Sequence, residues 1–284
     1  MNNVKDILND INNNENMQKT IDEYNKLSPK EQIELRVKWE NEIEGDRNLE
    51  DGIECPLCKN RGYITYFKEE NGKYYDYIKN CSCLEKRKQI IRAKNSGLGE
   101  YLNKRSKDYE AKEDWQIKNK QKMINYCNND FDSDLWFGAL GQSGSGKTLM
   151  CSIIANHLLY NCNKNVCYIT WTDFISKLKR DVMSDNTQSV SDYLDIIKKA
   201  DVLFIDELLK KYNDTDLKYI MEIINYRYTN NLKTIITSER TLENLLDIDE
   251  ATFGRVFEKC GDYLIEIPKD RNKNYRLKKL NNRY

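Results

Sequence analysis

Apolar and polar positions follow different patterns in the two halves of the chain. In the second half, five short apolar runs rich in β-branched and aromatic residues are separated by stretches with helical spacing. These runs predict strands at 135–140, 166–170, 202–206, 234–238 and 263–267. Short apolar strands that alternate with helices are typical of a parallel sheet covered on both faces. The pattern therefore predicts an α/β domain, which we place at residues 134–284.

The first 50 residues are highly polar and predict a helical arm. Its clearest helix starts with Ser28 as N-cap, Pro29 in the first turn and Glu31 closing a capping box, and Gly45 is the expected terminator. A solvated helical hairpin and a partner-binding arm both fit this composition.

Residues 51–88 form a second segment, which carries four cysteines in two pairs. Two runs of alternating residues, 63–67 and 73–79, flank Asn71-Gly72 and predict a β-hairpin. Residues 89–133 are rich in Lys, Asn and aromatic residues and predict a helical linker to the α/β domain.

Composition narrows the possible functions. The 284 residues include 46 basic and 46 acidic side chains, so any nucleic-acid contact must be a local basic patch. No apolar run reaches the roughly 18 to 20 residues that span a bilayer, and the N-terminus lacks the apolar core of a signal peptide. A cytoplasmic location without membrane contact is therefore expected. Thiols stay reduced there, so the nine cysteines are predicted to be metal ligands, core residues or reactive thiols.

A phosphate-binding loop follows the first strand predicted in the α/β domain. Its sequence fits G-x-x-x-x-G-K-[ST], and an apolar-faced helix is predicted to follow. Glycines let backbone N–H groups wrap phosphates at a helix N-terminus. Lys147 would neutralise the β and γ phosphates, and the Thr148 hydroxyl would ligate Mg²⁺. The predicted ligands are ATP or ADP with Mg²⁺, and the predicted binding residues are Gly141, Gln142, Ser143, Gly144, Ser145, Gly146, Lys147, Thr148 and Leu149.

Two carboxylates end the strand predicted at 202–206. Asp206 is expected to hold Mg²⁺ together with Thr148, and Glu207 is expected to polarise a water molecule for attack on the γ-phosphate. Adjacent carboxylates at the end of a buried strand are costly to ionise without a cation. The pair indicates a hydrolysing motor or switch and argues against a small-molecule kinase.

Polar residues further along the chain complete the predicted site. Ser238 or Glu239 would lie near the γ-phosphate and could sense the bound nucleotide, or could simply end a strand. Arg255, in "GRVFEKC", could be an arginine finger from a neighbouring subunit, because guanidinium neutralises charge growing on the transferred phosphoryl group. A surface salt bridge is the alternative for Arg255.

The four paired cysteines suit structural Zn²⁺. Cys55 and Cys58 form C-x2-C, and Cys81 and Cys83 follow 22 residues later as C-x-C. A reduced core cluster or a redox pair is the alternative. A closed site of four thiolates leaves no position open for a substrate. Zinc would therefore be structural, replacing the core that about 35 residues cannot build.

Together these features resemble the AAA+ ATPases of the replicative helicase loader family, of the DnaC and DnaI types and especially their phage versions. The resemblance spans Cys55 to Arg276 and rests on the cysteines, the phosphate loop and the segments "SGL" (96–98), "LFIDEL", "INYRY" (224–228), "TIITSE" and "GRVFEKC". It implies a five-stranded P-loop core without a C-terminal helical lid, which agrees with the 17 residues after the last predicted strand. By position it implies that the catalytic residues are Lys147, Asp206, Glu207, Glu239 and Arg255.

The resemblance also implies a function. The chain would load a replicative DNA helicase onto single-stranded DNA, would self-associate through its ATPase domains and would contact the helicase with its front region. The basic, tyrosine-containing segments Lys86–Arg105 and Lys269–Arg283 could bind DNA or be solvated basic faces. The alternatives are an IstB-type transposition helper ATPase and a nucleotide-controlled adaptor with negligible turnover. The zinc module favours the loader, because the IstB front end is helical.

Overall fold

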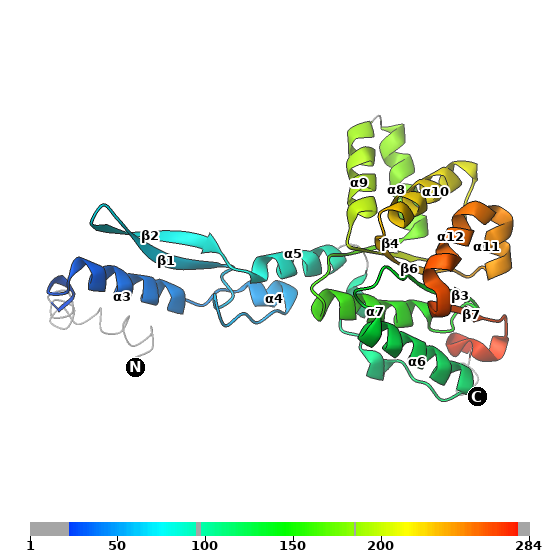
Figure 1. The fold of residues 1–284 in the computed structure, drawn as a ribbon, viewed down its shortest axis with the longest axis horizontal. Coiled ribbons are helices and arrows are strands. Elements are labelled where there is room, and N and C mark those ends of the chain that lie inside the picture. Colours follow the sequence, from blue (N-terminus) through cyan, green and yellow to red (C-terminus); the bar gives the residue numbers. More distant parts are fainter. Residues whose placement is uncertain (1–22, 95–97, 185, 278–284) are drawn as a thin grey trace. The chain divides into compact units, whose positions relative to one another are not determined.

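The computed structural model describes residues 23–94, 98–184 and 186–277 (Figure 1). The chain divides into two compact units, one ending at Lys88 and the other beginning at Gln89. Much of the predicted arm, most of the "SGL" segment and the end of the basic tail lie outside the described residues.

Helix α3 (Pro29–Glu42) follows a short helical stretch, residues 23–25, at the start of the described part, and its predicted capping box is confirmed. The Ser28 hydroxyl accepts a hydrogen bond from Glu31 N, and the Glu31 carboxylate accepts one from Ser28 N at 2.8 Å. Gly45 is not the terminator that the sequence predicts, since the helix ends at Glu42. A Cβ at Gly45 would lie 2.7 Å from Arg61 N, so glycine permits the close approach of two backbone segments there.

The predicted hairpin is also confirmed. Strand β1 (Tyr63–Glu70) pairs antiparallel with β2 (Lys73–Asn80), and the connecting residues Asn71 and Gly72 have φ of 54° and 74°. Positive φ at both positions gives the turn a twist that matches the strands. Helix α3 packs on both strands, and the short helix α4 (Arg47–Asp51) precedes the first cysteine pair.

The predicted linker is helical only in part. Helix α5 (Cys83–Ala93) extends into it, followed by the 3₁₀ turns η2 (Gly99–Tyr101) and η3 (Ser106–Asp108) and then by α6 (Asp114–Asn129). Within the second unit, α6 packs against α7, and its buried Tyr126 donates a hydrogen bond to the Leu135 carbonyl at 2.8 Å.

The second unit is built on a five-stranded sheet of order β4-β5-β6-β3-β7, in which every neighbouring pair is parallel. The strands are β3 (Phe137–Gly141), β4 (Val166–Thr170), β5 (Val202–Asp206), β6 (Lys233–Thr237) and β7 (Leu264–Ile267). Two predicted strands match β4 and β5, and the other three overlap the observed ones. All residues of β3, β5 and β6 are buried, which accounts for the apolar residues at the centre of each strand.

Helices cover both faces of this sheet. Helices α6 and α7 lie on one side and α8 to α12 on the other (Figure 1). The bounds are α7 (Lys147–Tyr160), α8 (Trp171–Met183), α9 (Thr187–Lys199), α10 (Asp214–Thr229), α11 (Leu242–Ile248) and α12 (Glu250–Cys260). Through residue 277, β7 is followed by the 3₁₀ turn η5 (Arg271–Lys273) and by three helical residues, 275–277. None of the helices in the described ranges is long and apolar enough to span a bilayer.

Strand order places the site. The chain passes from β3 to the far edge strand β4, so the direction of winding reverses beside β3. Open α/β sheets bind ligands at the carboxyl ends of the strands next to such a reversal. The ends of β3, β5 and β6 meet at this point.

Candidate functional site

The phosphate loop connects β3 to α7. Gly141, Gly144 and Gly146 have φ of 94°, 70° and 90°, which glycine adopts without strain. A Cβ at Gly141 would lie 2.1 Å from the Ile267 carbonyl oxygen, so only glycine fits where the loop passes β7.

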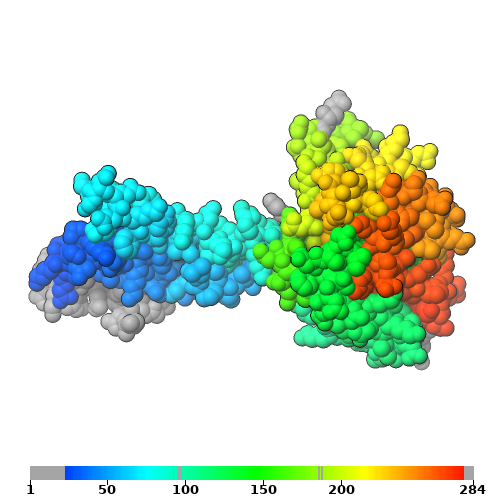
Figure 2. All heavy atoms as spheres, in the orientation of Figure 1, coloured from blue at the N-terminus to red at the C-terminus, as the bar shows by residue number. Residues whose placement is uncertain are grey.

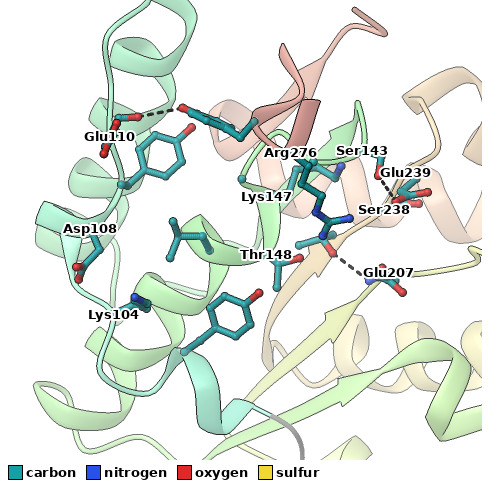
Figure 3. A pocket seen from close by; sticks show the side chains of 17 residues that line it. Lys104, Asp108, Glu110, Ser143, Lys147, Thr148, Glu207, Ser238, Glu239 and Arg276 are labelled. Carbon is teal, nitrogen blue, oxygen red and sulfur yellow. Dashed lines mark hydrogen bonds between the residues drawn. The ribbon is translucent and has the colours of Figure 1, made fainter. Parts of the chain in front are cut away.

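A cavity of about 470 Å³ opens beside this loop (Figure 3). Lys147 and Thr148 line it from the start of α7, and Glu207 and Glu239 line it from the ends of β5 and β6. Its volume is in the range of small-molecule sites. The structure thus brings together residues that lie up to 92 positions apart in the sequence.

Lys147 is 7% exposed and turned toward the loop. Its Nζ donates hydrogen bonds to the carbonyl oxygens of Gly141 at 2.8 Å and Gln142 at 2.6 Å. Burial lowers the pKa of Lys147, while the charges of Glu239 and Asp206 act in the opposite direction. A cation is therefore placed at the loop, next to carboxylates that favour its charged form.

Asp206 lies at the floor of the site and is 5% exposed. The Thr148 hydroxyl donates to its Oδ1 at 3.0 Å, the Tyr168 hydroxyl donates to its Oδ2 at 3.0 Å, and the Thr237 hydroxyl also bonds to Oδ1. A carboxylate and a hydroxyl side by side are the hard oxygen ligands that Mg²⁺ prefers. The residues present therefore fit Mg²⁺.

Glu207 has a backbone φ of 55°, which is uncommon for a residue with a side chain. Its N–H donates to the Thr237 hydroxyl at 3.0 Å, and the next N–H, of Leu208, donates to the Thr237 carbonyl at 2.8 Å. Its carboxylate accepts a hydrogen bond from Lys210 at 2.8 Å, and this side chain is 33% exposed. Thr237 thus holds the turn that presents Glu207 at the edge of the cavity.

The two sensor candidates face different ways. The Glu239 carboxylate accepts a hydrogen bond from the Ser143 hydroxyl of the phosphate loop at 2.7 Å. Ser238 is fully buried, and its hydroxyl donates to the Leu208 carbonyl at 2.8 Å. Glu239 is therefore the candidate whose side chain contacts the phosphate loop, whereas Ser238 contacts it through its carbonyl, which accepts from Gly141 N at 3.0 Å.

Arg255 does not line this cavity. It lies on α12, a helix that reaches the surface of the second unit (Figure 2), and it donates to Asn225 Oδ1 at 2.8 Å. Its guanidinium is 5.8 Å from the centre of the Tyr228 ring. The structure therefore separates Arg255 from the other predicted catalytic residues of its own chain.

The four predicted cysteine ligands form one cluster in the first unit. Their sulfur atoms all lie within 4.8 Å of one another, with 3.8 Å between Cys55 and Cys81 and 3.6 Å between Cys58 and Cys83. Tetrahedral zinc with Zn–S bonds of about 2.3 Å needs sulfur atoms about 3.8 Å apart. The donor set and its spacing fit zinc.

Residues around the cluster hold its sulfur atoms in place. Gly62 N donates to Cys58 Sγ at 3.3 Å, and Arg87 Nε donates to Cys83 Sγ at 3.4 Å. Asn60, with φ of 68°, accepts a hydrogen bond from the N–H of the first cysteine at 2.9 Å. Burial of Cys58 acts to raise its pKa, but hydrogen bonds to its sulfur, the strongest from Gly62 N–H, outweigh burial and lower the pKa to about 7. The thiolate form, which a metal requires, is thus favoured at Cys58, whereas burial raises the pKa of Cys81 and of Cys83.

Comparison with known proteins identifies the family. The sequence matches the family described as the bacterial DnaA ATPase domain over residues 119–258. The phage-like element PBSX protein XkdC of Bacillus subtilis is 31% identical over 229 residues, covering 75% of this chain and 82% of XkdC. The chain belongs to the XkdC family. The Bacillus subtilis protein YqaM is 28% identical over 281 residues, covering 79% of this chain and 86% of YqaM.

Two solved structures of other proteins share the fold of this chain. The crystal structure of DnaI aligns with a TM-score of 0.50 at 23% identity, covering 60% of this chain and 93% of DnaI. The replication initiator DnaA bound to AMPPCP and single-stranded DNA aligns with a TM-score of 0.50 at 19% identity, covering 64% of this chain and 57% of the DnaA chain. The expected helicase-loader type of AAA+ fold is confirmed.

Sequence reasoning missed several residues of the site in this XkdC relative. Thr237 and Tyr168, which bond to Asp206, were not singled out. Tyr101, Lys104 and Tyr109 also line the cavity, although their sequence pattern indicates only a linker. Thr237 could have been found from the sequence, because it is a polar residue at the end of a buried strand. The remaining residues have no such local pattern, because packing between distant segments brings them to the site.

Proposed function

We propose that this protein is an ATP-dependent loader of a replicative DNA helicase onto single-stranded DNA, which binds ATP and hydrolyses it. The observation that carries the proposal is the 3.0 Å contact of Thr148 with Asp206 beside a phosphate loop, with Glu207 at the edge of the same cavity. Such a site suits a nucleoside triphosphate with Mg²⁺, and the match to the DnaA ATPase domain supports ATP.

The proposed chemistry assigns one task to each group. Lys147 leaves its two loop carbonyls and binds the phosphates, and Glu207 orients a water molecule for attack on the γ-phosphate. Mg²⁺, when bound through Thr148 and Asp206, neutralises charge on the β and γ phosphates. Glu239, bonded to Ser143, registers whether the γ-phosphate is present.

The proposed partner surface lies on the first unit, which carries the four clustered cysteines and is here called the cysteine unit. It exposes large apolar side chains on and around its helices, at Trp39 (49% exposed), Ile43 (48%), Leu49 (84%) and Leu57 (61%). Exposed apolar side chains gathered on one unit favour a protein partner. Four thiolates around zinc would keep that small unit folded. We assign helicase contact to this unit.

The second unit, which carries the phosphate loop, is proposed to self-associate and to contact DNA. Arg255 lies on α12 outside the nucleotide cavity of its own chain, and we assign it to the nucleotide of a neighbouring subunit. The DnaA structure, which holds single-stranded DNA, supports a similar ligand here. Loading of a replicative helicase places the protein in the cytoplasm.

The test measures ATP hydrolysis and helicase capture together. Purified protein is assayed for phosphate release alone, with single-stranded DNA, and with DNA and the host replicative helicase. Helicase capture is measured with ATP and with ADP, and the Lys147→Ala variant is the control. We expect stimulated hydrolysis and ATP-dependent capture. Helicase capture without turnover would instead establish a nucleotide-controlled adaptor, and no capture with either nucleotide would refute the loader.

A further inference from the structure

The β-hairpin of the cysteine unit has two different faces. Residues directly opposite each other in the register share a face, and successive residues of each strand alternate between the faces. Helix α3 packs against one face (Figure 1): its Arg36 pairs with Asp76 at 2.6 Å, and Thr65 on the same face is 4% exposed. The other face is here called the tyrosine face. Its residues are Ile64, Tyr66, Lys68, Glu70, Lys73, Tyr75, Tyr77 and Lys79.

Three tyrosine rings lie next to one another on the tyrosine face. Tyr66 and Tyr77 are directly opposite each other, and their ring centres are 5.8 Å apart with the planes tilted by 31°. Tyr75, the preceding residue of β2 on this face, is 45% exposed. Residues two apart in a strand are separated by about 7 Å. The three rings therefore form one aromatic surface across both strands.

Lysine ammonium groups lie over these rings. Lys68 Nζ is 5.8 Å from the centre of the Tyr66 ring and 5.9 Å from that of the Tyr77 ring. Lys79 Nζ is 5.4 Å from the centre of the Tyr66 ring, and in the described part of the chain no carboxylate pairs with either lysine. Glu70, the one carboxylate on a face with three lysines, accepts a hydrogen bond from the Tyr77 hydroxyl at 2.8 Å. The tyrosine face therefore carries a net positive charge.

This combination of side chains suits a single-stranded nucleic acid. Every base has a flat π face that stacks on an aromatic ring, and lysines beside the rings bind phosphates. Protein interfaces, in contrast, are depleted of lysine. The exposed apolar side chains that favour a protein partner, such as Trp39 and Leu49, lie on the helices and not on the hairpin. Charge and chemistry thus favour a nucleic acid over a protein at this face.

We propose that the tyrosine face binds single-stranded DNA. Bases stack on Tyr66, Tyr75 and Tyr77, and the ammonium groups of Lys68 and Lys79 bind the neighbouring phosphates. The contact lies in the cysteine unit and needs no ATP, so it goes beyond the DNA contact proposed for the second unit. Because stacking and phosphate binding do not read base edges, the face accepts any sequence.

The first experiment measures the binding of a short fluorescent oligo(dT) to the full chain without nucleotide. Tyr66→Leu should weaken binding about tenfold, the usual effect of losing one stacked base. Tyr66→Phe keeps the ring and should bind within about twofold of wild type. Trp39→Leu is the matched control, because it removes an exposed aromatic ring from α3, which packs on the other face. Its affinity for oligo(dT) should not change.

The salt dependence of the same binding tests the lysines. Lys68→Met and Lys79→Met should each reduce the slope of log affinity against log salt by about 0.7, the value for one phosphate contact on a single strand. Lys38→Met removes an exposed charge from α3 and should leave the slope unchanged. A slope that stays at the wild-type value in both hairpin variants would overturn the phosphate contacts.

Other outcomes would refute the assignment while leaving the proposed function standing. Normal oligo(dT) binding by Tyr66→Leu would exclude stacking, and an equal loss in Tyr66→Phe would assign the effect to the hydroxyl. Loss of helicase capture with normal DNA binding would make the tyrosine face a protein contact. Tighter binding of oligo(U) than of oligo(dT) would make RNA the ligand. None of these results bears on ATP-dependent capture of the helicase through the other surface.

Photochemical crosslinking keeps the proposal testable if Tyr66→Leu does not fold. Zinc content and thermal unfolding show whether each variant is folded. Wild-type protein is irradiated with an oligonucleotide that contains iododeoxyuridine, and the attached peptides are identified by mass spectrometry. We expect attachment within residues 63–80. Attachment confined to the second unit would overturn the proposal.

Discussion

Replacing Arg87 with methionine should lower the zinc affinity of the cysteine unit about 100-fold. Arg87 is 2% exposed, and its Nη1 donates to both oxygens of Asp51 at 2.6 and 2.8 Å. Its Nη2 donates to the Ile53 carbonyl and to Asn60 Oδ1, both at 2.9 Å, and its Nε contacts Cys83. One side chain thus joins α4, the first cysteine loop and α5.

The magnitude follows from the buried carboxylate that the substitution would leave behind. Removing one partner of a buried ion pair costs about 3–5 kcal/mol, and for so small a unit we take the lower end, about 3 kcal/mol. Folding and metal binding are coupled in structural zinc sites, so this loss should appear as weaker zinc binding. Each tenfold change in affinity corresponds to about 1.4 kcal/mol, which gives about 100-fold.

Zinc affinity is measured by competition with a coloured chelator at fixed pH. Lys88→Met is the matched control, because the neighbouring Lys88 side chain is 56% exposed and pairs with Glu85 on the helix surface. Its zinc affinity should stay within about twofold, as expected for an exposed pair. The double variant Asp51→Leu/Arg87→Met should recover at least about tenfold, because it leaves no buried charge unpaired. The reasoning fails if Arg87→Met binds zinc like wild type, or if the double variant is as weak as the single one.

Four further outcomes follow from the sites. Protein purified without chelators should carry about one Zn²⁺ per chain by elemental analysis, and Cys81→Ser should lose it; zinc-free wild type would contradict this. Lys147→Ala should weaken nucleotide binding, whereas Glu207→Gln should bind ATP normally and release phosphate poorly; normal turnover in the latter would remove Glu207 from the mechanism. Arg255→Ala and Lys147→Ala should each be inactive alone but should recover part of the ATPase rate when they are mixed with each other in the presence of helicase. Lys147→Ala subunits would supply the arginine to the intact nucleotide site of Arg255→Ala subunits, and an arginine supplied in this way is worth about 10³ to 10⁵ in rate. A mixture that assembles but stays inactive would exclude that role. Thr237→Val removes the hydroxyl that bonds both acidic residues, so hydrolysis should fall about tenfold with binding within threefold; unchanged hydrolysis would show that the turn needs no such bond.

The sequence allowed the sheet and the phosphate loop to be predicted because both depend on local patterns. Strands β4 and β5 are unbroken apolar runs bounded by polar residues, and the loop must carry glycine wherever its φ is positive. Strand β3 begins two residues later than predicted. Trp136 is buried like a strand residue, but its N–H donates to the Lys259 carbonyl in the last turn of α12 instead of to a strand.

The remaining parts of the site could not be predicted because they depend on contacts between distant segments. Residues 268–277, after β7, have the sequence pattern of a basic tail, yet Tyr275 N donates to the carbonyl of Gly144, 131 positions earlier in the chain. Likewise, Tyr101 and Lys104 reach the cavity because Asn156 on α7 donates hydrogen bonds to both of their carbonyls, at 2.6 and 3.0 Å. No spacing rule within one segment reports such a pairing.

The position of β7 beside β3 bears on how the protein matures. Strand β3 is synthesised more than 120 residues before the strand that pairs with it on that side, and long-range pairing of this kind is slow to form. In the phosphate loop, Gln142 N donates a hydrogen bond to the Ile267 carbonyl of β7. A nascent chain interrupted before β7 would therefore carry the loop sequence without its shape. The ability to bind nucleotide should therefore arise late in synthesis. Incomplete chains would not enter an assembly that requires ATP.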